Sequence, residues 1–217
     1  MPAWLILALI LFAAWILWRR YQRVMQAKRE RFIAGYDFAP ALVEKFRQTR
    51  SGLDPTQEQK VFDGLREYFQ VCNMAGRRMV SMPSQAVDDA WHNLILFTRT
   101  YDLFCRKAFG RFLHHTPAEA MTSPTRAQDG IKRAWRLCCK REGIDPRKPT
   151  HLPLLFAIDS ELGIADGFHY DLHCDAKNRD NYCASHIGCG GGCSSGCGGD
   201  SGGSSCSSGC GGGCGGD

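Results

Sequence analysis

The sequence predicts an all-α protein with an N-terminal transmembrane helix, a compact multi-helix domain and a disordered Gly/Cys/Ser tail. An uncharged apolar run opens the chain, apolar residues at helical spacing fill the middle between clear cap residues, and the composition collapses near the C-terminus. Few stretches combine β-branched residues with period-two alternation, so no sheet is expected. The three expected parts are residues 1–34, 35–187 and 188–217.

Residues 3–18 form the predicted membrane span. They carry no charged side chain, and residues 19–31, which follow, are rich in Lys and Arg. A helix of this length reaches roughly 24 to 27 Å, the short end of what crosses a bilayer, and Trp15, Trp18 and Tyr21 suit one interface. A cleaved signal has its positive charge before the apolar run, whereas here the charge follows it. A buried core helix is disfavoured because the run is apolar on every face and begins at the chain terminus. We therefore predict a retained single-pass anchor in the plasma (inner) membrane, with the C-terminal domain cytoplasmic.

The formal net charge of +5 lies mainly in the basic stretch after the span and on helical faces. This placement favours anionic lipid headgroups as partners. The aromatic residues that typically interleave with basic ones in RNA-binding modules are missing from the sequence pattern, so no nucleic acid is expected. The membrane and a protein partner are the predicted interactions.

Local cap signals divide the middle of the chain into helices. Residues 54–57 (Asp-Pro-Thr-Gln) supply a capping box, and helical spacing continues to Ala75 before Gly76 ends it. A second segment with one apolar stripe runs from Ser84 to Gly110. Short linkers imply antiparallel neighbours among five or six helices. Further helices are predicted at 116–119, 123–143 and 152–162.

The tail is rich in thiols that would be reduced in the cytoplasm, where clustered cysteines more often bind metal than form disulfides. Glycine lets the backbone wrap a soft cation, so zinc or copper(I) is the predicted cofactor. A flexible tether with incidental cysteines, or a substrate for modification, are the alternatives. The cysteines form two triplets, each followed by Gly-Gly-Asp: Cys189, Cys193 and Cys197, then Cys206, Cys210 and Cys214.

A second set of candidate ligands lies between the domain and the tail. Cys183, His186 and Cys189 have a spacing typical of metal chelation, and Cys174 or His173 is placed to add a fourth ligand across a loop. The alternative is that these residues begin the low-complexity tail and are solvated.

The region from Asp88 to residue 117 is dense in Trp, His, Cys and aromatic residues. It reads Asp-x-x-Trp-His at 88–92, Tyr-x-x-x-Cys at 101–105, and then Gly110 and a His-containing turn. This pattern resembles the glycine-rich domain-containing-protein-like family, a domain of unknown function, in a bacterial-type membrane-anchored form. The resemblance implies a helical fold and no established reaction. The second histidine of the plant-like Trp-His-x-His pattern is Leu94 here.

Asp88 and His92 are four residues apart and share a helix face, so the carboxylate can orient the imidazole. If the chain folds back at Gly110, His114 or His115 approaches that helix, and with Cys105 completes a cluster that suits zinc or iron. A buried hydrogen-bonded Asp–His pair in an ordinary core is the structural alternative. A nucleophilic dyad of Cys105 with His92 or His114 is the catalytic one.

The favoured function is a non-enzymatic, membrane-anchored metal- or thiol-binding module whose helical domain docks a protein partner. The alternatives are a metal- or cysteine-dependent enzyme and a scaffold with an inert flexible tail. The enzyme would use Asp88, His92, Cys105 and His114.

Overall fold

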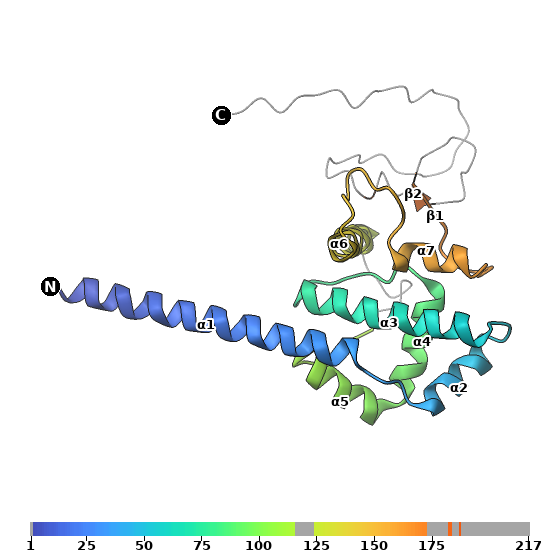
Figure 1. Ribbon diagram of the computed structural model, residues 1–217, viewed down its shortest axis with the longest axis horizontal. Coiled ribbons are helices and arrows are strands. Elements are labelled where there is room, and N and C mark those ends of the chain that lie inside the picture. Colours follow the sequence, from blue (N-terminus) through green and yellow to red (C-terminus); the bar gives the residue numbers. More distant parts are fainter. Residues whose placement is uncertain (1, 116–123, 173–181, 184–186, 188–217) are drawn as a thin grey trace, which may run out of the picture.

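The computed structural model confirms the all-α fold class (Figure 1). It describes residues 2–115, 124–172, 182–183 and 187. The predicted helix at 116–119 and the predicted tail lie outside these residues. The helices are α1 (Ala3–Ala34), α2 (Pro40–Thr49), α3 (Pro55–Ala75), α4 (Gln85–Leu96), α5 (Thr98–Phe109), α6 (Pro124–Glu142) and α7 (Leu154–Glu161). Two residues of β1 (Tyr170–Asp171) pair in parallel with β2 (Tyr182–Cys183).

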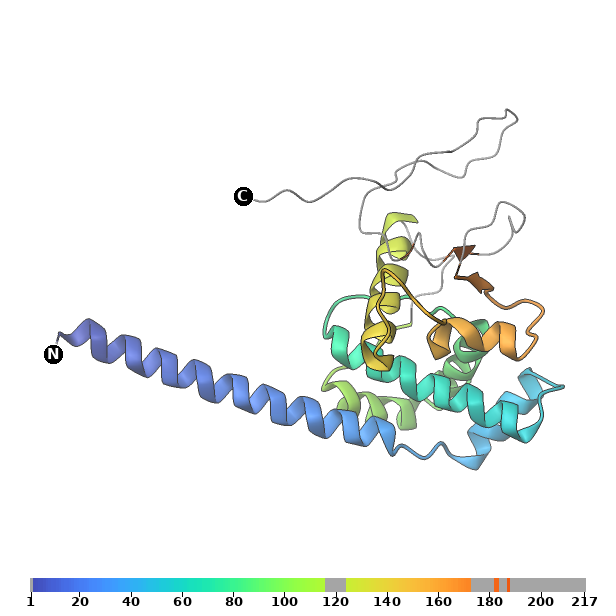
Figure 2. The ribbon, with the colours of Figure 1, turned by 45° about the horizontal axis from the view of Figure 1, so that its top comes forward.

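Helix α1 stands away from the domain over its N-terminal half and joins it over its last turns (Figures 1 and 2). The helix is long and apolar enough to cross a membrane, and its apolar window is fully exposed. At the other end Ile33 is fully buried, and the Gln70 side chain donates a hydrogen bond of 2.8 Å to the carbonyl oxygen of Glu30. The predicted anchor and the domain therefore share one continuous helix.

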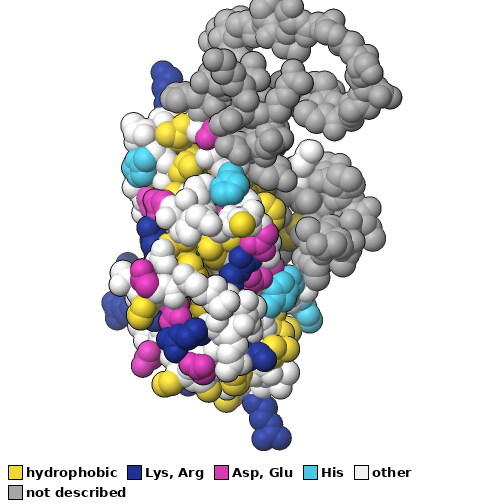
Figure 3. All heavy atoms as spheres, turned by 90° about the vertical axis from the view of Figure 1, so that its right-hand side faces the viewer, with side chains coloured by type: hydrophobic (Ala, Val, Ile, Leu, Met, Phe, Trp, Pro, Cys, Tyr) yellow, Lys and Arg dark blue, Asp and Glu magenta, His cyan; other side chains and the backbone are white. Residues whose placement is uncertain are grey.

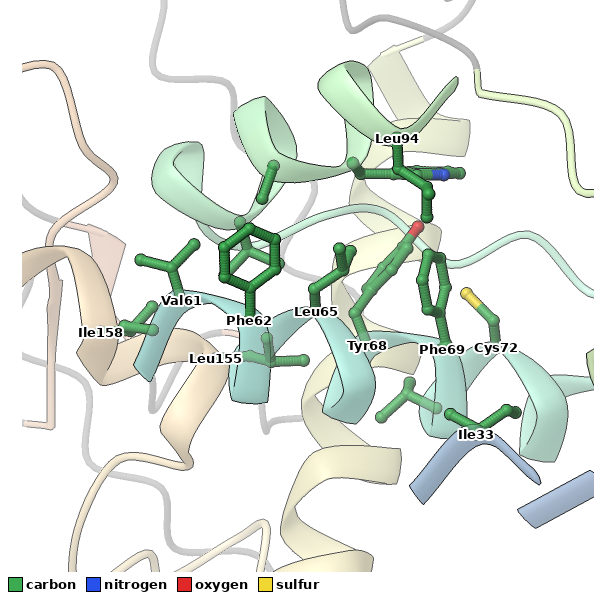
Figure 4. Close-up of a cluster of buried hydrophobic side chains, with 14 of the residues drawn as sticks. Ile33, Val61, Phe62, Leu65, Tyr68, Phe69, Cys72, Leu94, Leu155 and Ile158 are labelled. Carbon is green, nitrogen blue, oxygen red and sulfur yellow. The ribbon is translucent and has the colours of Figure 1, made fainter. Parts of the chain in front are cut away.

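Helix α3 lies at the centre of the domain and packs against α1, α4, α6 and α7. The predicted capping box is confirmed, because the Asp54 carboxylate accepts from two backbone amides of the first turn and Gln57 accepts from the Asp54 amide. Apolar residues at helical spacing point from α3 into the core (Figure 4). A Cβ atom on Gly64 would come within 2.9 Å of Val87, so this glycine allows α3 and α4 to approach closely.

The segment predicted as one stripe from Ser84 to Gly110 is broken into α4 and α5 at Phe97. The break turns α5 back along the domain, where Phe104 packs against Phe32 of α1 and Phe69 of α3 and the buried Tyr101 bonds to Trp91 of α4. Burial of the Phe104 and Tyr101 rings favours the bend over a straight helix. Gly110 closes α5 in the left-handed conformation, as the sequence predicted.

The N-terminus of α4 is fixed by a buried carboxylate from α7. Asp159 is 1% exposed and accepts hydrogen bonds from the Ser84 hydroxyl at 2.6 Å and from the backbone amides of Gln85, Ala86 and Phe168 at 2.7, 3.2 and 2.9 Å. A negative charge at a helix N-terminus is stabilised by the free amides there. This contact sets the direction of α4, which carries the candidate site.

Candidate metal centre

Three side chains that suit a metal ion meet where α4 faces the segment after α5. Asp88 and His92 come from successive turns of α4, and His115 follows the turn at Gly110. The Asp88 carboxylate lies 2.9 Å from Nε2 of His115 and 3.4 Å from Nδ1 of His92. One ligand atom from each residue lies within 4.8 Å of the other two. The chain thus brings two imidazoles and one carboxylate to one point.

The position of His115 is set by a short relay of hydrogen bonds. The Trp91 indole donates to the Tyr101 hydroxyl at 3.0 Å, and that hydroxyl donates to the carbonyl oxygen of Leu113 at 2.5 Å. The edge of Trp91 also packs against the His115 ring, with centroids 4.5 Å apart. Trp91 and Tyr101 are both buried, so the relay holds residues 113–115 against α4.

The site is closed on one side and open on the other. The side chains of His115 and Asp88 are 11% and 18% exposed, whereas that of His92 is 47% exposed. Seen from the side away from the N-terminal end of α1, histidine side chains lie beside acidic ones on the surface (Figure 3). A metal held by these three groups would keep a coordination position toward solvent on the His92 side.

The donor set fits zinc in its chemistry, and its atoms lie close to the spacing that a zinc site needs. Zinc accepts imidazole nitrogen and carboxylate oxygen at about 2.0 to 2.2 Å, which puts neighbouring ligand atoms about 3.3 Å apart in a tetrahedron. The two imidazoles face different oxygens of the Asp88 carboxylate, His92 at 3.4 Å from Oδ2 and His115 at 2.9 Å from Oδ1. Binding of a zinc ion would therefore need small shifts of these side chains. Copper(I) prefers thiolates, and this group of ligands has none.

A comparison with protein families identifies the family of this chain. The model of the UCP032817-like family matches residues 28–190, three quarters of the sequence and the whole site. The chain belongs to the UCP032817-like family. No curated protein and no solved structure matches it. The matched region begins inside α1 and includes the last turns of that helix, which are packed in the domain.

In this UCP032817-like protein, the predicted ligands His114 and Cys105 lie apart from the three clustered side chains. His114 is exposed and its ring packs against Phe112, with centroids 4.9 Å apart. Cys105 is fully buried, and burial raises the pKa of its thiol. The sequence left open whether His114 or His115 approaches α4, and in the structure it is His115. The hydrogen bond from Tyr101 to the carbonyl oxygen of Leu113, two residues earlier, holds this segment in place.

Burial of Cys105 leads to a testable expectation for its reactivity. A protonated thiol without solvent access reacts slowly, so iodoacetamide should label Cys105 at least about 100-fold more slowly in the folded chain than in urea. Mass spectrometry of peptides after timed labelling measures this ratio, and Cys72, Cys138 and Cys139, which are also buried and unpaired, should behave alike. Equal rates in the folded and unfolded chain would contradict the buried placement and revive the nucleophilic dyad.

The other predicted ligands lie beyond the described side chains of this UCP032817-like protein. Cys183 belongs to β2, in register with Asp171 of β1, but its side chain is not among those described. The site between domain and tail and the thiol site in the tail therefore stay predictions. The remaining members lie outside the described residues: His173, Cys174, His186, Cys189, Cys193, Cys197, Cys206, Cys210 and Cys214.

Proposed function

We propose that this protein is a non-enzymatic, membrane-anchored zinc-binding module whose helical domain holds one zinc ion at Asp88, His92 and His115. The carrying observation is the meeting of two imidazoles and a carboxylate within 4.8 Å. Imidazole and carboxylate are two of the ligand types that zinc uses in proteins, and three protein ligands leave a fourth position for exchange. Asp88 contributes a negative charge, which lowers the cost of holding a divalent cation.

The open side of the site favours transfer of the metal over permanent storage. His92 is the most exposed of the three ligands, so an incoming thiolate or imidazole meets it first. We assign the Cys-rich tail, together with Cys174, Cys183 and His186, the capture of zinc or copper(I). A protein partner docked on the helical domain would receive or supply the ion.

The proposal includes a location. A basic stretch after the apolar part of α1 supports the plasma (inner) membrane with the domain in the cytoplasm, where thiols stay reduced. The glycine-rich tail and the Asp-x-x-Trp-His pattern support a bacterial-type relationship to the glycine-rich domain-containing-protein-like family. Both the location and this relationship are proposals that go beyond membership of the UCP032817-like family.

Elemental analysis of the detergent-solubilised protein, purified without a histidine tag, tests the proposal. We compare the full chain, a chain ending at Ile187, and the shorter chain with His92→Ala and His115→Ala. We expect about one zinc ion to remain after removal of the tail and to be lost with the two histidines. Zinc that disappears with the tail alone would locate all binding there, and absence of metal from the full chain would favour the scaffold.

A metal-dependent enzyme is the second candidate, favoured by one observation. Catalytic zinc sites keep an open position for water, and the exposure of His92 provides one here. The buried, protonated Cys105 speaks against a cysteine-dependent enzyme. Hydrolytic turnover that requires zinc and is lost in His92→Ala would favour the enzyme over the binding module.

A further inference from the structure

A cavity of about 310 Å³ lies where α3 and α5 both end beside α1. Gln70 of α3 contacts Glu30 of α1, and the cavity brings the end of α3 beside Gln22 and Arg29. Helix α3 therefore runs antiparallel to α1, and its C-terminal end points toward the proposed membrane span (Figure 1). The cavity opens on the end of the domain that faces the bilayer.

The charge of the cavity is entirely positive. Arg29, Arg77 and Arg111 line it, and no acidic residue does. Arg111 donates to the carbonyl oxygen of Gly76 at 2.6 Å, whereas Arg29 and Arg77 have no carboxylate partner within ion-pair distance in the described part of the chain. Arg29 is half-buried, and a partly desolvated guanidinium without a partner is costly. An anion bound here would remove that cost.

A polar group in the cavity wall also lacks a partner. The side-chain amide nitrogen of Asn73, a residue that lines the cavity, is buried and donates no hydrogen bond to any residue that the structure describes. A buried donor left unpaired costs about 1 to 3 kcal/mol, and a phosphate oxygen would accept from it. At the cavity floor, Gly110 has a φ of +68°, and a Cβ atom there would lie 2.5 Å from the Arg29 guanidinium. The positive φ favours glycine at this position, and a side chain there would push the Arg29 guanidinium aside.

The depth of the cavity identifies the source of the anion. Tyr21 is the last aromatic residue expected at the interface, and Gln22 of the cavity wall follows it directly. Arg29 lies about 12 Å farther along the helix at 1.5 Å per residue. The headgroup layer adds about 5 to 8 Å to each side of the hydrocarbon core, so Gln22 lies at headgroup depth and the backbone of Arg29 a few ångström beyond it. Helical side chains point back toward the helix N-terminus, here toward the membrane, so the long Arg29 side chain can reach the phosphates.

We propose that this cavity binds the phosphate of an anionic phospholipid headgroup, with Arg29 and Arg77 as the charged contacts and Asn73 as a hydrogen-bond donor. The inference rests on α1 crossing the membrane and is independent of the zinc site. Bound lipid would fix the angle between the domain and the bilayer, because the headgroup would contact α1, α3 and the end of α5 together.

Native mass spectrometry of the full chain in detergent, with phosphatidylglycerol or phosphatidylcholine added at equal concentrations, tests this proposal. We expect phosphatidylglycerol to bind at least about tenfold more tightly, since each basic residue near an anionic lipid contributes severalfold. The double variant Arg29→Gln/Arg77→Gln should lose this preference. The matched control Lys28→Gln/Arg31→Gln removes the same charge from exposed positions of α1 outside the cavity and should keep it.

Further arms decide between the possible outcomes. Arg77→Glu alters only an exposed side chain, so it should fold and still weaken phosphatidylglycerol binding. Equal losses in the cavity variant and the control would show diffuse attraction to basic residues and overturn the proposal. Inorganic phosphate that displaces the lipid at similar concentrations would make a soluble anion the ligand, which also overturns it. The proposal is also overturned if the double variant and Arg77→Glu both keep the preference for phosphatidylglycerol.

Discussion

Replacing Asp159 by alanine should lower the free energy of unfolding by about 3 to 5 kcal/mol. Asp159 is buried and accepts four hydrogen bonds, three of them from backbone amides. Two of those amides, of Gln85 and Ala86, belong to the first turn of α4, where a negative charge is favoured. The variant removes the acceptor from these two donors, of which the amide of Ala86 is buried and that of Gln85 partly buried.

Urea unfolding of the detergent-solubilised chain, followed by tryptophan fluorescence, measures the change. Trp91 and Trp135 are both buried in the domain and report its unfolding. Asp166→Asn is the matched control, because that carboxylate also pairs across the fold, with Arg50, but its side chain is 64% exposed. We expect the control to cost less than about 1 kcal/mol. A similar small cost for Asp159→Ala would mean that α4 does not depend on this cap.

The parts of the fold that local chemistry decides could be predicted from the sequence. The capping box at Asp54 and Gln57 needs only neighbouring residues, and Gly110 ends α5 because its backbone adopts a positive φ. Helix α2 was missed, although Pro40 stands at its first position, since its apolar residues Leu42 and Phe46 are few and their burial depends on α4. Local signals therefore located helix ends better than short helices.

Long-range contacts account for the rest. The break at Phe97 depends on the burial of Phe104 against α1 and α3, which periodicity within the segment does not reveal. The pairing of Asp88 with His92 follows from a spacing of four on one helix and could be predicted. The choice of His115 could not, because it depends on a hydrogen bond to the neighbouring backbone and on packing against an indole ring.

Zinc affinity should distinguish His115 from its neighbour His114. In the chain ending at Ile187, either Asp88→Ala or His115→Ala should weaken zinc binding by at least about 100-fold. Loss of a residue that only supports a ligand weakens metal binding by up to about 100-fold, and loss of a ligand itself should cost at least as much. The reason is that each removes one of only three ligands. Competition with a chromophoric zinc chelator measures the affinity without interference from tail cysteines.

His114→Ala is the matched control for this measurement. It removes an imidazole one residue away whose ring packs against Phe112, so we expect zinc affinity to change less than about threefold. The same variants also separate metal binding from a purely structural role of the Asp88–His115 hydrogen bond, which is 2.9 Å long. If the Asp88–His115 hydrogen bond is purely structural, His115→Ala should have a lower melting temperature than wild type in the absence of zinc. Its zinc affinity should then be as weak as that of wild type. A metal site instead makes wild type, but not His115→Ala, melt at higher temperature as zinc is added, because only the folded wild-type site binds the ion.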